Sequence, residues 1–192
     1  MKKILILISG IPAAGKSTFA IWLSKRLNTP MISYDSIKEK VMELVTQSNI
    51  PQEQMQLFHE FPYELFWFAC KEAMNCDGIV IADYIFTTKM NERLDSLTKS
   101  LGYQTLQIHF DTEIEIAYQR FLERNKDANK EYNIRPINIS LDTFKNITEQ
   151  NKKFRYGSNY IVVDTTDYAK ISYEEIYRQI NLFCQMNSHL SK

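Results

Sequence analysis

Gly10-Ile11-Pro12-Ala13-Ala14-Gly15-Lys16-Ser17 is the stretch that decides the fold, and Thr18 follows it directly. Its pattern, G-x-x-x-x-G-K-S, is that of a phosphate-binding loop, whose glycines let backbone N–H groups turn toward an anion. In such loops the lysine reaches the outer phosphates and the serine hydroxyl ligates Mg²⁺. The prediction is therefore that a nucleotide binds along this loop, in contact with Gly10, Ile11, Pro12, Ala13, Ala14, Gly15, Lys16, Ser17 and Thr18.

The residues on either side of the loop support this interpretation. Residues 2–9 contain a short apolar run typical of a strand that is buried on both faces. Residues 17–27 carry Phe19, Leu23 and Leu27 at helical spacing. The order strand, glycine loop, helix directs both the loop amides and the helix N-terminus at the same anion.

The composition is that of an ordinary globular chain. Its 192 residues, 44% of them hydrophobic, predict one domain, residues 1–192, around one core. Lysine plus arginine and aspartate plus glutamate each number 23, so the overall charge does not favour nucleic acid or an anionic membrane as a partner. Cys70, Cys76 and Cys184 form no metal-binding pattern, and an odd count argues against a disulfide framework. The first apolar run is too short for a signal peptide or a membrane span, so a cytoplasmic location is expected. The composition does not indicate the oligomeric state.

Glycine and proline mark the junctions between predicted helices and strands. Gly78, Gly102 and Gly157 each stand between a helical pattern and an apolar run, and Pro30 precedes another such run. The alternation predicts an α/β fold, in which helices on both faces cover a five-stranded parallel sheet in three layers, α/β/α. The expected strands are residues 2–9, 31–34, 79–83, 104–110 and 160–164.

Acidic residues end the later strands, and ligands bind at the carboxyl ends of strands in open parallel sheets. After Asp35, Ser36 and Glu39 fit a capping box, which would leave Asp35 available for chemistry. Asp83 ends a very apolar strand, where structure alone does not require an acid. We expect Asp83 to hold Mg²⁺ or to orient a substrate. At Asp111 and Asp164 helix capping or a turn is the preferred interpretation.

Two arginines stand one turn apart on the helix predicted for residues 113–125. Arg120 and Arg124 repel each other by a few tenths of a kcal/mol unless an anion or acid lies between them. Either the pair lies on a solvated face, with Arg120 paired to Glu123, or it clamps the transferring phosphate. The polar residues that follow have no apolar period, as in a lid, so a lid is predicted at about residues 118–138.

An aromatic stretch lies between the second and third expected strands. Its main apolar stripe has the spacing of one helical face and is assigned to the core. Three phenylalanines lie off the stripe and are alternative candidates for a substrate pocket. The stripe consists of Tyr63, Phe66, Trp67, Cys70 and Met74, and the other three are Phe58, Phe61 and Phe68.

Together these stretches resemble the P-loop kinases of the adenylate-kinase-like group, including polynucleotide 5′-kinases and the zeta-toxin and chloramphenicol-phosphotransferase-like kinases. The likeness lies in residues 10–18, 34–38, 80–83 and 123–125. It implies a P-loop NTPase fold with a helical lid, and an ATP-dependent kinase that uses Mg²⁺.

The resemblance also implies roles for single residues. The acid that matches Asp35 is the general base on the acceptor hydroxyl, and the positions that match Lys38 and Asp83 lie in the acceptor site. Arginines near Arg124 contact the donor phosphates. On this basis the predicted catalytic residues are Asp35, Lys16, Arg120 and Arg124, the acceptor site is Asp35, Lys38 and Asp83, and the Mg²⁺ ligands are Ser17 and Asp83.

This chain departs from the polynucleotide-kinase pattern at several positions. Lys38 replaces the usual arginine and lacks its bidentate fork, and Tyr84 stands where a small polar residue is usual. The second lid arginine has no counterpart in register, although Arg135 lies nearby. The prediction is therefore phosphoryl transfer from ATP to the hydroxyl of a small molecule, with a polynucleotide 5′-hydroxyl kinase and a nucleotide-binding regulatory module with little turnover as alternatives.

Overall fold

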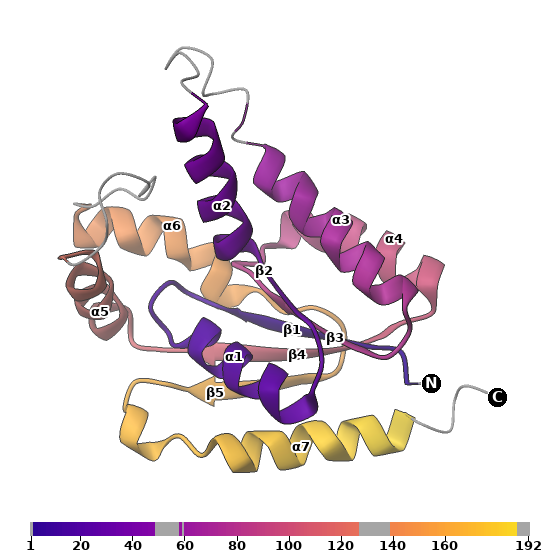
Figure 1. Cartoon of the computed structure of the whole chain (residues 1–192). Helices are drawn as coiled ribbons and strands as arrows, with labels where there is room; N and C mark the ends of the chain where they lie inside the picture. The colour runs from indigo at the N-terminus through magenta and orange to yellow at the C-terminus, as the bar shows by residue number, and fades with distance from the viewer. Residues whose placement is uncertain (1, 49–57, 59, 127–138, 188–192) are drawn as a thin grey trace.

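The structure, a computed structural model, describes residues 2–48, 58, 60–126 and 139–187 (Figure 1). No helix within those ranges is both long enough and apolar enough to cross a membrane. The elements are, in order, β1 (Ile4–Gly10), α1 (Lys16–Leu27), β2 (Met31–Ser33), α2 (Tyr34–Gln47), α3 (Phe61–Asn75), β3 (Ile79–Asp83), α4 (Asn91–Leu101), β4 (Gln104–Asp111), α5 (Ile114–Lys126), α6 (Leu141–Lys153), β5 (Tyr160–Asp164) and α7 (Tyr173–Met186), with 3₁₀ turns at Thr88–Met90 and Tyr168–Lys170.

The five strands form one parallel sheet in the order β2-β3-β1-β4-β5. This confirms the predicted five-stranded parallel sheet, with strand ends that differ from the prediction by one or two residues. β1 lies at the centre, between β3 and β4, which is where the strand order reverses. A crevice forms at such a switch point, at the carboxyl ends of the strands.

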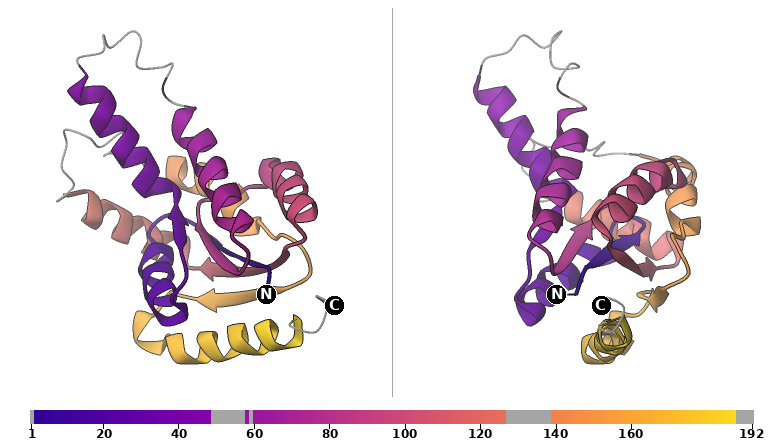
Figure 2. Two further views of the ribbon diagram at one scale, coloured as in Figure 1. Left: turned by 45° about the vertical axis from the view of Figure 1, so that its right-hand side comes forward. Right: turned by 90° about the vertical axis from the view of Figure 1, so that its right-hand side faces the viewer.

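Both faces of the sheet are covered, so the predicted three layers are confirmed. Along β1, Ile4, Ile6 and Ile8 pack in one core with α1 and α7, while Leu5 and Leu7 pack in a second core with α3 and α4. Figures 1 and 2 show α1 and α7 on one side of the sheet and α3 and α4 on the other. Since neighbouring side chains of a strand point to opposite faces, burial on both sides explains why β1 is continuously apolar.

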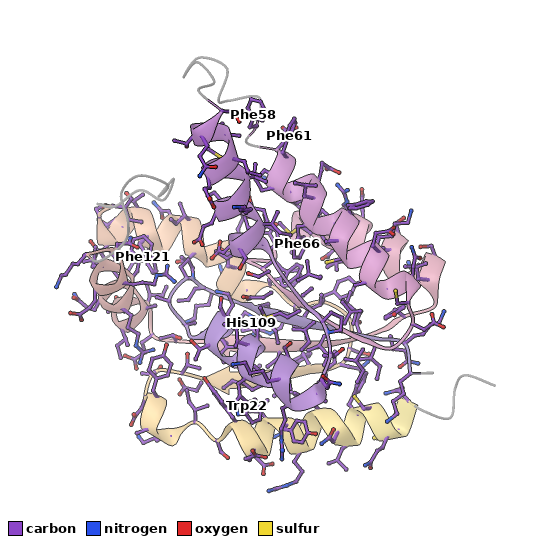
Figure 3. The ribbon with its side chains drawn as sticks, in the orientation of Figure 1. Trp22, Phe58, Phe61, Phe66, His109 and Phe121 are labelled. Carbon is purple, nitrogen blue, oxygen red and sulfur yellow. The ribbon has the colours of Figure 1, made fainter. Side chains whose placement is uncertain are left out.

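The aromatic helix α3 buries the stripe that was assigned to the core. Phe66, Trp67, Cys70 and Met74 are buried, which confirms that assignment for them, and Tyr63 is half-buried against the same core. Phe61 and Phe68 are 50% and 61% exposed, and Phe58 packs on Phe61 at the outer end of α3 (Figure 3). None of these three phenylalanines lines the cavity at the carboxyl ends of the strands that is described below.

Gly10 ends β1 against the neighbouring strand β4. Its φ is 127°, and a β-carbon there would lie 2.2 Å from the carbonyl oxygen of Phe110. Only glycine accepts both that backbone angle and that close approach. The residue type at position 10 therefore lets the chain leave the sheet and enter the phosphate loop.

Candidate active site

The phosphate loop turns through two left-handed residues before α1 begins. Ala13 has φ 61° and Gly15 has φ 86°. Lys16 is the first residue of α1, is 8% exposed, and its Nζ donates to the carbonyl oxygen of Ile11 at 2.7 Å. No side chain caps the N-terminus of α1. The N–H groups of its first turn are therefore oriented to meet an anion held by the loop.

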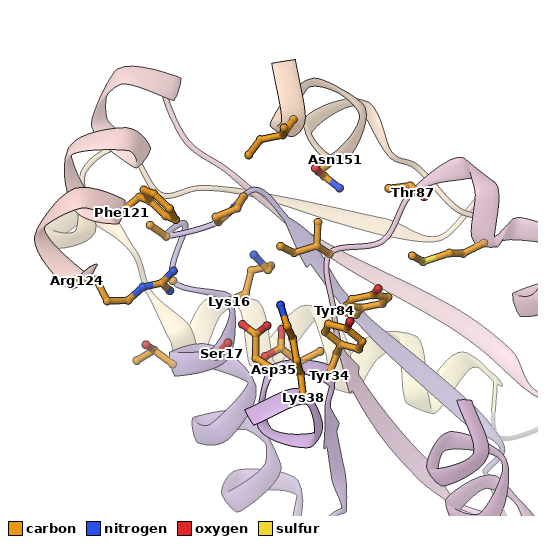
Figure 4. Close-up of a pocket in the computed structure, with 18 of the residues that line it drawn as sticks. Lys16, Ser17, Tyr34, Asp35, Lys38, Tyr84, Thr87, Phe121, Arg124 and Asn151 are labelled. Atoms are coloured by element: carbon orange, nitrogen blue, oxygen red, sulfur yellow. The ribbon is translucent and has the colours of Figure 1, made fainter. Parts of the chain in front are cut away.

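A cavity of about 480 Å³ opens beside this loop (Figure 4). It brings together most of the residues that the sequence predicts for the site, from four different elements and from the loop itself. Figure 4 shows Lys16 in the middle, Arg124 entering from α5, and Asp35 and Lys38 on α2. The predicted site residues in the lining are Pro12, Ala13, Gly15, Lys16, Ser17, Thr18, Asp35, Lys38, Asp83 and Arg124. Gly10, Ile11 and Ala14 belong to the loop but do not line this cavity.

Asp35 lies in the first turn of α2, but the cap of that helix differs from the prediction. The Oγ of Ser33 accepts from the backbone N–H of Ser36 at 3.4 Å, so Ser33 is the N-cap and the predicted capping box at Ser36 is wrong. β2 ends at Ser33 and α2 begins at the next residue, which leaves no loop in which Ser36 could cap. Asp35 is the second residue of α2 and not its N-cap, and Lys38 follows it one turn later on the same helix face.

Asp83 is a buried acid at the end of β3, 4% exposed. Burial raises its pKa, while a hydrogen bond from the Ser17 hydroxyl and the charge of Lys16 act in the opposite direction. The hydroxyl of Ser17 and the carboxylate of Asp83 therefore lie next to each other, and their role as Mg²⁺ ligands stays a prediction. Mg²⁺ in phosphoryl-transfer sites takes one or two protein oxygens and completes its shell with water and phosphates, so this pair fits the ion.

The two arginines of α5 do not form the predicted clamp. Arg124 lines the cavity, but Arg120 donates to the carbonyl oxygens of Thr165 and Thr166 at 2.7 and 2.9 Å. The Arg120 guanidinium also lies 3.8 Å from the ring centroid of Tyr168. These contacts all lie in the turn that follows β5. Arg120 reaches this turn because α5 follows β4, and β4 is the neighbour of β5 in the sheet.

The alternative partner of Arg120 is also not found, because the carboxylate of Glu123 pairs with Lys126 at 3.6 Å. The predicted lid, residues 118–138, is only partly described. Its first part is the regular helix α5, which continues to Lys126. Residues 127–138, and with them Arg135, lie outside the described residues.

A second hollow, of about 450 Å³, adjoins the phosphate loop at Gly15 and Thr18, which also line the first cavity. Gly15, Thr18, Tyr168, Ile171 and Tyr173 line it. The Tyr168 hydroxyl donates to the carbonyl oxygen of Ala13 at 3.2 Å, which ties the turn after β5 to the phosphate loop. Asp164 lies in that turn, where its Oδ1 accepts from the N–H of Thr166, as the turn interpretation predicts.

Several residues of the central cavity were not predicted from the sequence. Tyr34 and Tyr84 form a wall beside Asp35, and Thr87 and Asn151 add polar groups. Tyr34 and Tyr84 are the immediate neighbours of two predicted acids, which was a usable signal. Asn151 comes from α6, far along the chain, and no local pattern marks it.

Comparison with known proteins finds one similar sequence and two similar structures among others. The L-seryl-tRNA(Sec) kinase of Methanococcus maripaludis is 22% identical over 182 residues, which cover 92% of this chain but 64% of that protein. A putative kinase from Chloroflexus aurantiacus has a solved structure with a TM-score of 0.76 at 17% identity, covering 97% of this chain and 98% of that one. Shikimate kinase from Aquifex aeolicus has a TM-score of 0.56 at 22% identity, covering 97% and 98%.

The structural likenesses show a shared fold. A match to a family model shows which family the chain belongs to, because the match spans most of the chain, from β1 into α6. Residues 5–147 match the model AAA_33, which is described as an AAA domain, and the chain therefore belongs to that family.

Proposed function

We propose that this protein is a kinase that transfers the γ-phosphoryl group of ATP to a hydroxyl group of a small molecule. One observation carries the proposal: the phosphate loop, the Asp35 carboxylate and Arg124 line one cavity, from three separate parts of the chain. Binding a nucleotide requires the loop, but it does not require an acid from a second helix in the same cavity. The similarity to proteins named as kinases supports the same activity.

In the proposed reaction, the acceptor hydroxyl lies between Asp35 and the γ-phosphate. Its oxygen forms a bond to the γ-phosphorus, the bond from that phosphorus to the β,γ-bridging oxygen breaks, and ADP leaves. Asp35 takes the hydroxyl proton as the new bond forms. Lys16 and Arg124 offset negative charge on the phosphoryl oxygens, a kind of contact whose removal commonly lowers the rate by about 10²-fold or more.

Ser17 and Asp83 are the residues that would hold Mg²⁺. When bound, the ion neutralises part of the charge on the phosphate oxygens. The raised pKa of Asp83 fits this assignment, because a buried carboxylate beside a hydroxyl oxygen gains most from a cation.

We assign the base of the nucleotide to the second hollow, which adjoins the loop at Gly15 and Thr18. The aromatic rings of Tyr168 and Tyr173 supply apolar faces there. An enzyme that consumes ATP in this way fits the cytoplasmic location expected from the sequence.

A nucleic acid acceptor is the second candidate, because the relative from M. maripaludis is named as a tRNA kinase. Lysine plus arginine balance aspartate plus glutamate at 23 each, which does not favour a polyanion. A 5′-hydroxyl oligonucleotide or a seryl-tRNA as acceptor would show a steep loss of activity with added salt. Transfer to a small alcohol would be nearly independent of salt.

The test of the proposal uses two variants in single-turnover assays with γ-labelled ATP. Lys16→Ala should abolish transfer and weaken ATP binding, because the ammonium contacts the phosphates. Asp35→Asn should lower the transfer rate by at least about 10²-fold with ATP binding within about threefold, because it removes only the base. Near-normal transfer by Asp35→Asn would contradict its role as the base, and unchanged ATP binding by Lys16→Ala would contradict the nucleotide site.

A further inference from the structure

The cavity has an aromatic wall on the acceptor side, formed by Tyr34 and Tyr84. Their ring centroids are 4.1 Å apart with an interplanar angle of 35°, and both rings line the cavity next to Asp35. Figure 4 shows the two rings side by side, on the opposite side of Lys16 from Arg124. A molecule that approaches Asp35 from the cavity therefore meets a flat, apolar surface.

This wall is held rigidly by the second core. The ring of Tyr84 packs at 5.1 Å from Phe66 and 5.6 Å from Phe86, between centroids, and Tyr34 packs on Phe66 at 6.2 Å. Phe66 and Phe86 are both buried. These contacts hold the two tyrosine rings in place, so an incoming ligand meets a preformed wall.

The hydroxyl groups of the wall are uncharged near neutral pH. A tyrosine hydroxyl loses its proton only near pH 10, so both groups are neutral here. They offer a donor and an acceptor to a ligand but no charge.

The charges on this side of the cavity do not suit an anionic acceptor. Asp35 and Lys38 place one carboxyl group and one ammonium group there, while Asp83 is assigned to Mg²⁺ beside Ser17. Among the described lining residues Arg124 is the only arginine, and it stands on the phosphate side. A carboxylate or phosphate on the acceptor would therefore lose its hydration beside the Asp35 carboxylate and, among the described residues, without an arginine to bind it in bidentate fashion.

The remaining lining is mixed in a way that suits a polyhydroxylated ring. Thr87 contributes a hydroxyl, and Asn151 contributes an amide that is 4% exposed and donates to the carbonyl of Phe86 at 3.4 Å. Ile85, Met90 and Ile147 add apolar surface. Pockets of this kind bind a ring by its apolar faces and fix its orientation through a few polar contacts.

We propose that the acceptor is a non-anionic ring alcohol of the size of a hexose or cyclitol, whose C–H face packs on Tyr84 and whose reacting hydroxyl lies at Asp35. This inference rests on the proposed kinase function and adds the class of substrate. Tyr84 is then a specificity-determining residue, because its ring offers a flat apolar surface to the C–H face of the ligand.

The first arm of the test compares acceptors that differ only in charge. Glucose is paired with glucuronate and galactose with galacturonate, and myo-inositol is added as a neutral cyclitol. Phosphoryl transfer from labelled ATP should favour the neutral member of each pair by at least about tenfold in kcat/KM. Preference for the uronic acids, or for a 5′-hydroxyl oligonucleotide, would overturn the inference.

The second arm tests Tyr84 with matched variants on the best neutral acceptor. Tyr84→Leu keeps apolar volume but removes the flat face, and should raise the acceptor KM by about tenfold while ATP affinity stays within about twofold. Tyr84→Phe keeps the face and should stay within about threefold of the wild type. Tyr63→Leu is the control. Tyr63 lies on α3, with its ring centroid 6.5 Å from that of Tyr84, but it does not line the cavity. Equal KM effects for Tyr84→Leu and Tyr63→Leu would show that Tyr84 acts only through packing.

ATP turnover separates failure of this inference from failure of the proposed function. ATP binding and slow transfer to water, both lost in Lys16→Ala, report on the nucleotide site without any acceptor. If these are present and an anionic acceptor is preferred, the acceptor class is wrong and the kinase function stands. If they are absent in the wild type, the proposed function itself is wrong.

Discussion

At the scale of single residues, the phosphate loop depends on its glycines, which have no side chain, as much as on its lysine. Gly10 lets β1 pass within van der Waals limits of the Phe110 carbonyl, and Gly15 lies under the ring of Tyr168. Lys16 then stands at the start of α1 with its ammonium group inside the loop. The anion site is therefore made by backbone geometry first and by the lysine charge second.

The contact at Gly10 gives a prediction for stability. Gly10→Ala should destabilise the fold by at least about 3 kcal/mol, because the new β-carbon would lie 2.2 Å from the Phe110 carbonyl oxygen at a left-handed φ. Gly78→Ala is the matched control, since it shares a positive φ, 112°, but its β-carbon would meet nothing within 4 Å. It should cost about 1–2 kcal/mol. Urea unfolding monitored by circular dichroism measures both, and equal losses would contradict the close approach.

At the scale of elements, α5 uses two arginines one turn apart for different purposes. Arg124 faces the cavity, whereas Arg120 joins α5 to the turn after β5 through two backbone carbonyls and the ring of Tyr168. The same turn also contacts the phosphate loop, through the Tyr168 hydroxyl. Arg120 is therefore a positioning residue for the nucleotide side of the site.

Separate variants of the two arginines should have separable effects. Arg120→Lys keeps the charge but cannot donate to both carbonyls, so it should weaken ATP binding by about tenfold and leave kcat within about threefold. Arg124→Ala should lower kcat by about 10²-fold, because it removes charge stabilisation from the transferring group. Calorimetric ATP titration and steady-state kinetics give the two readouts. A loss of kcat in Arg120→Lys as large as that in Arg124→Ala would restore the clamp hypothesis.

At the scale of the whole molecule, a buried polar cluster joins the central strands to the segment before β5. Ser9 on β1 contacts the Nδ1 of His109 on β4 at 3.0 Å, and the Gln107 amide donates to Ser9 at 2.7 Å. The same amide donates to the carbonyl of Phe154 at 3.0 Å, and its oxygen accepts from the N–H of Tyr156 at 2.6 Å. Polar groups buried at this depth are stabilising only while they stay uncharged and paired.

The cluster predicts how stability depends on pH. Burial, with help from the charge of Arg155, lowers the pKa of His109 from its ordinary 6.5 to about 4. Since the folded state holds the imidazole neutral, protonation of His109 favours the unfolded state. The free energy of unfolding therefore keeps its full value above about pH 6.5 and decreases as the pH falls toward 4, by about 2 to 3 kcal/mol at pH 4.5. Unfolding free energies of wild type and His109→Asn, measured from pH 7.5 to 4.5, should show a shallower pH dependence in the variant. Parallel curves would contradict the assignment.

Much of the fold could be predicted from the sequence, because its signals are local. The apolar run of β1, the loop glycines and the junction glycines act through neighbouring residues, and the sheet they predict is confirmed. Asp35, Asp83 and Lys16 were expected to converge because parallel strands end at the same edge, and the cavity contains all three. Their chemical roles stay predictions.

What could not be predicted depends on contacts between distant segments. The direction of Arg120 depends on the carbonyls of Thr165 and Thr166, 45 and 46 residues later in the chain. The wall of Tyr34 and Tyr84 exists because β2 and β3 are neighbours, which local spacing does not reveal. The cap at Ser33 was missed because Ser36 with Glu39 matches the same pattern three residues further on.

The central position of β1 also has a consequence for the order in which the molecule is made. Ile4 pairs with Ile79 and with Gln104, so the first strand finds its neighbours only after long stretches of chain have followed it. Closing such large loops costs entropy before any contact repays it, which makes parallel pairing of this kind slow. The phosphate loop rests on Phe110 through Gly10, so a nascent chain on the ribosome completes it only once β4, ending at Asp111, has emerged. The phosphate loop, which lies near the start of the sequence, is thus among the later segments to reach its final conformation.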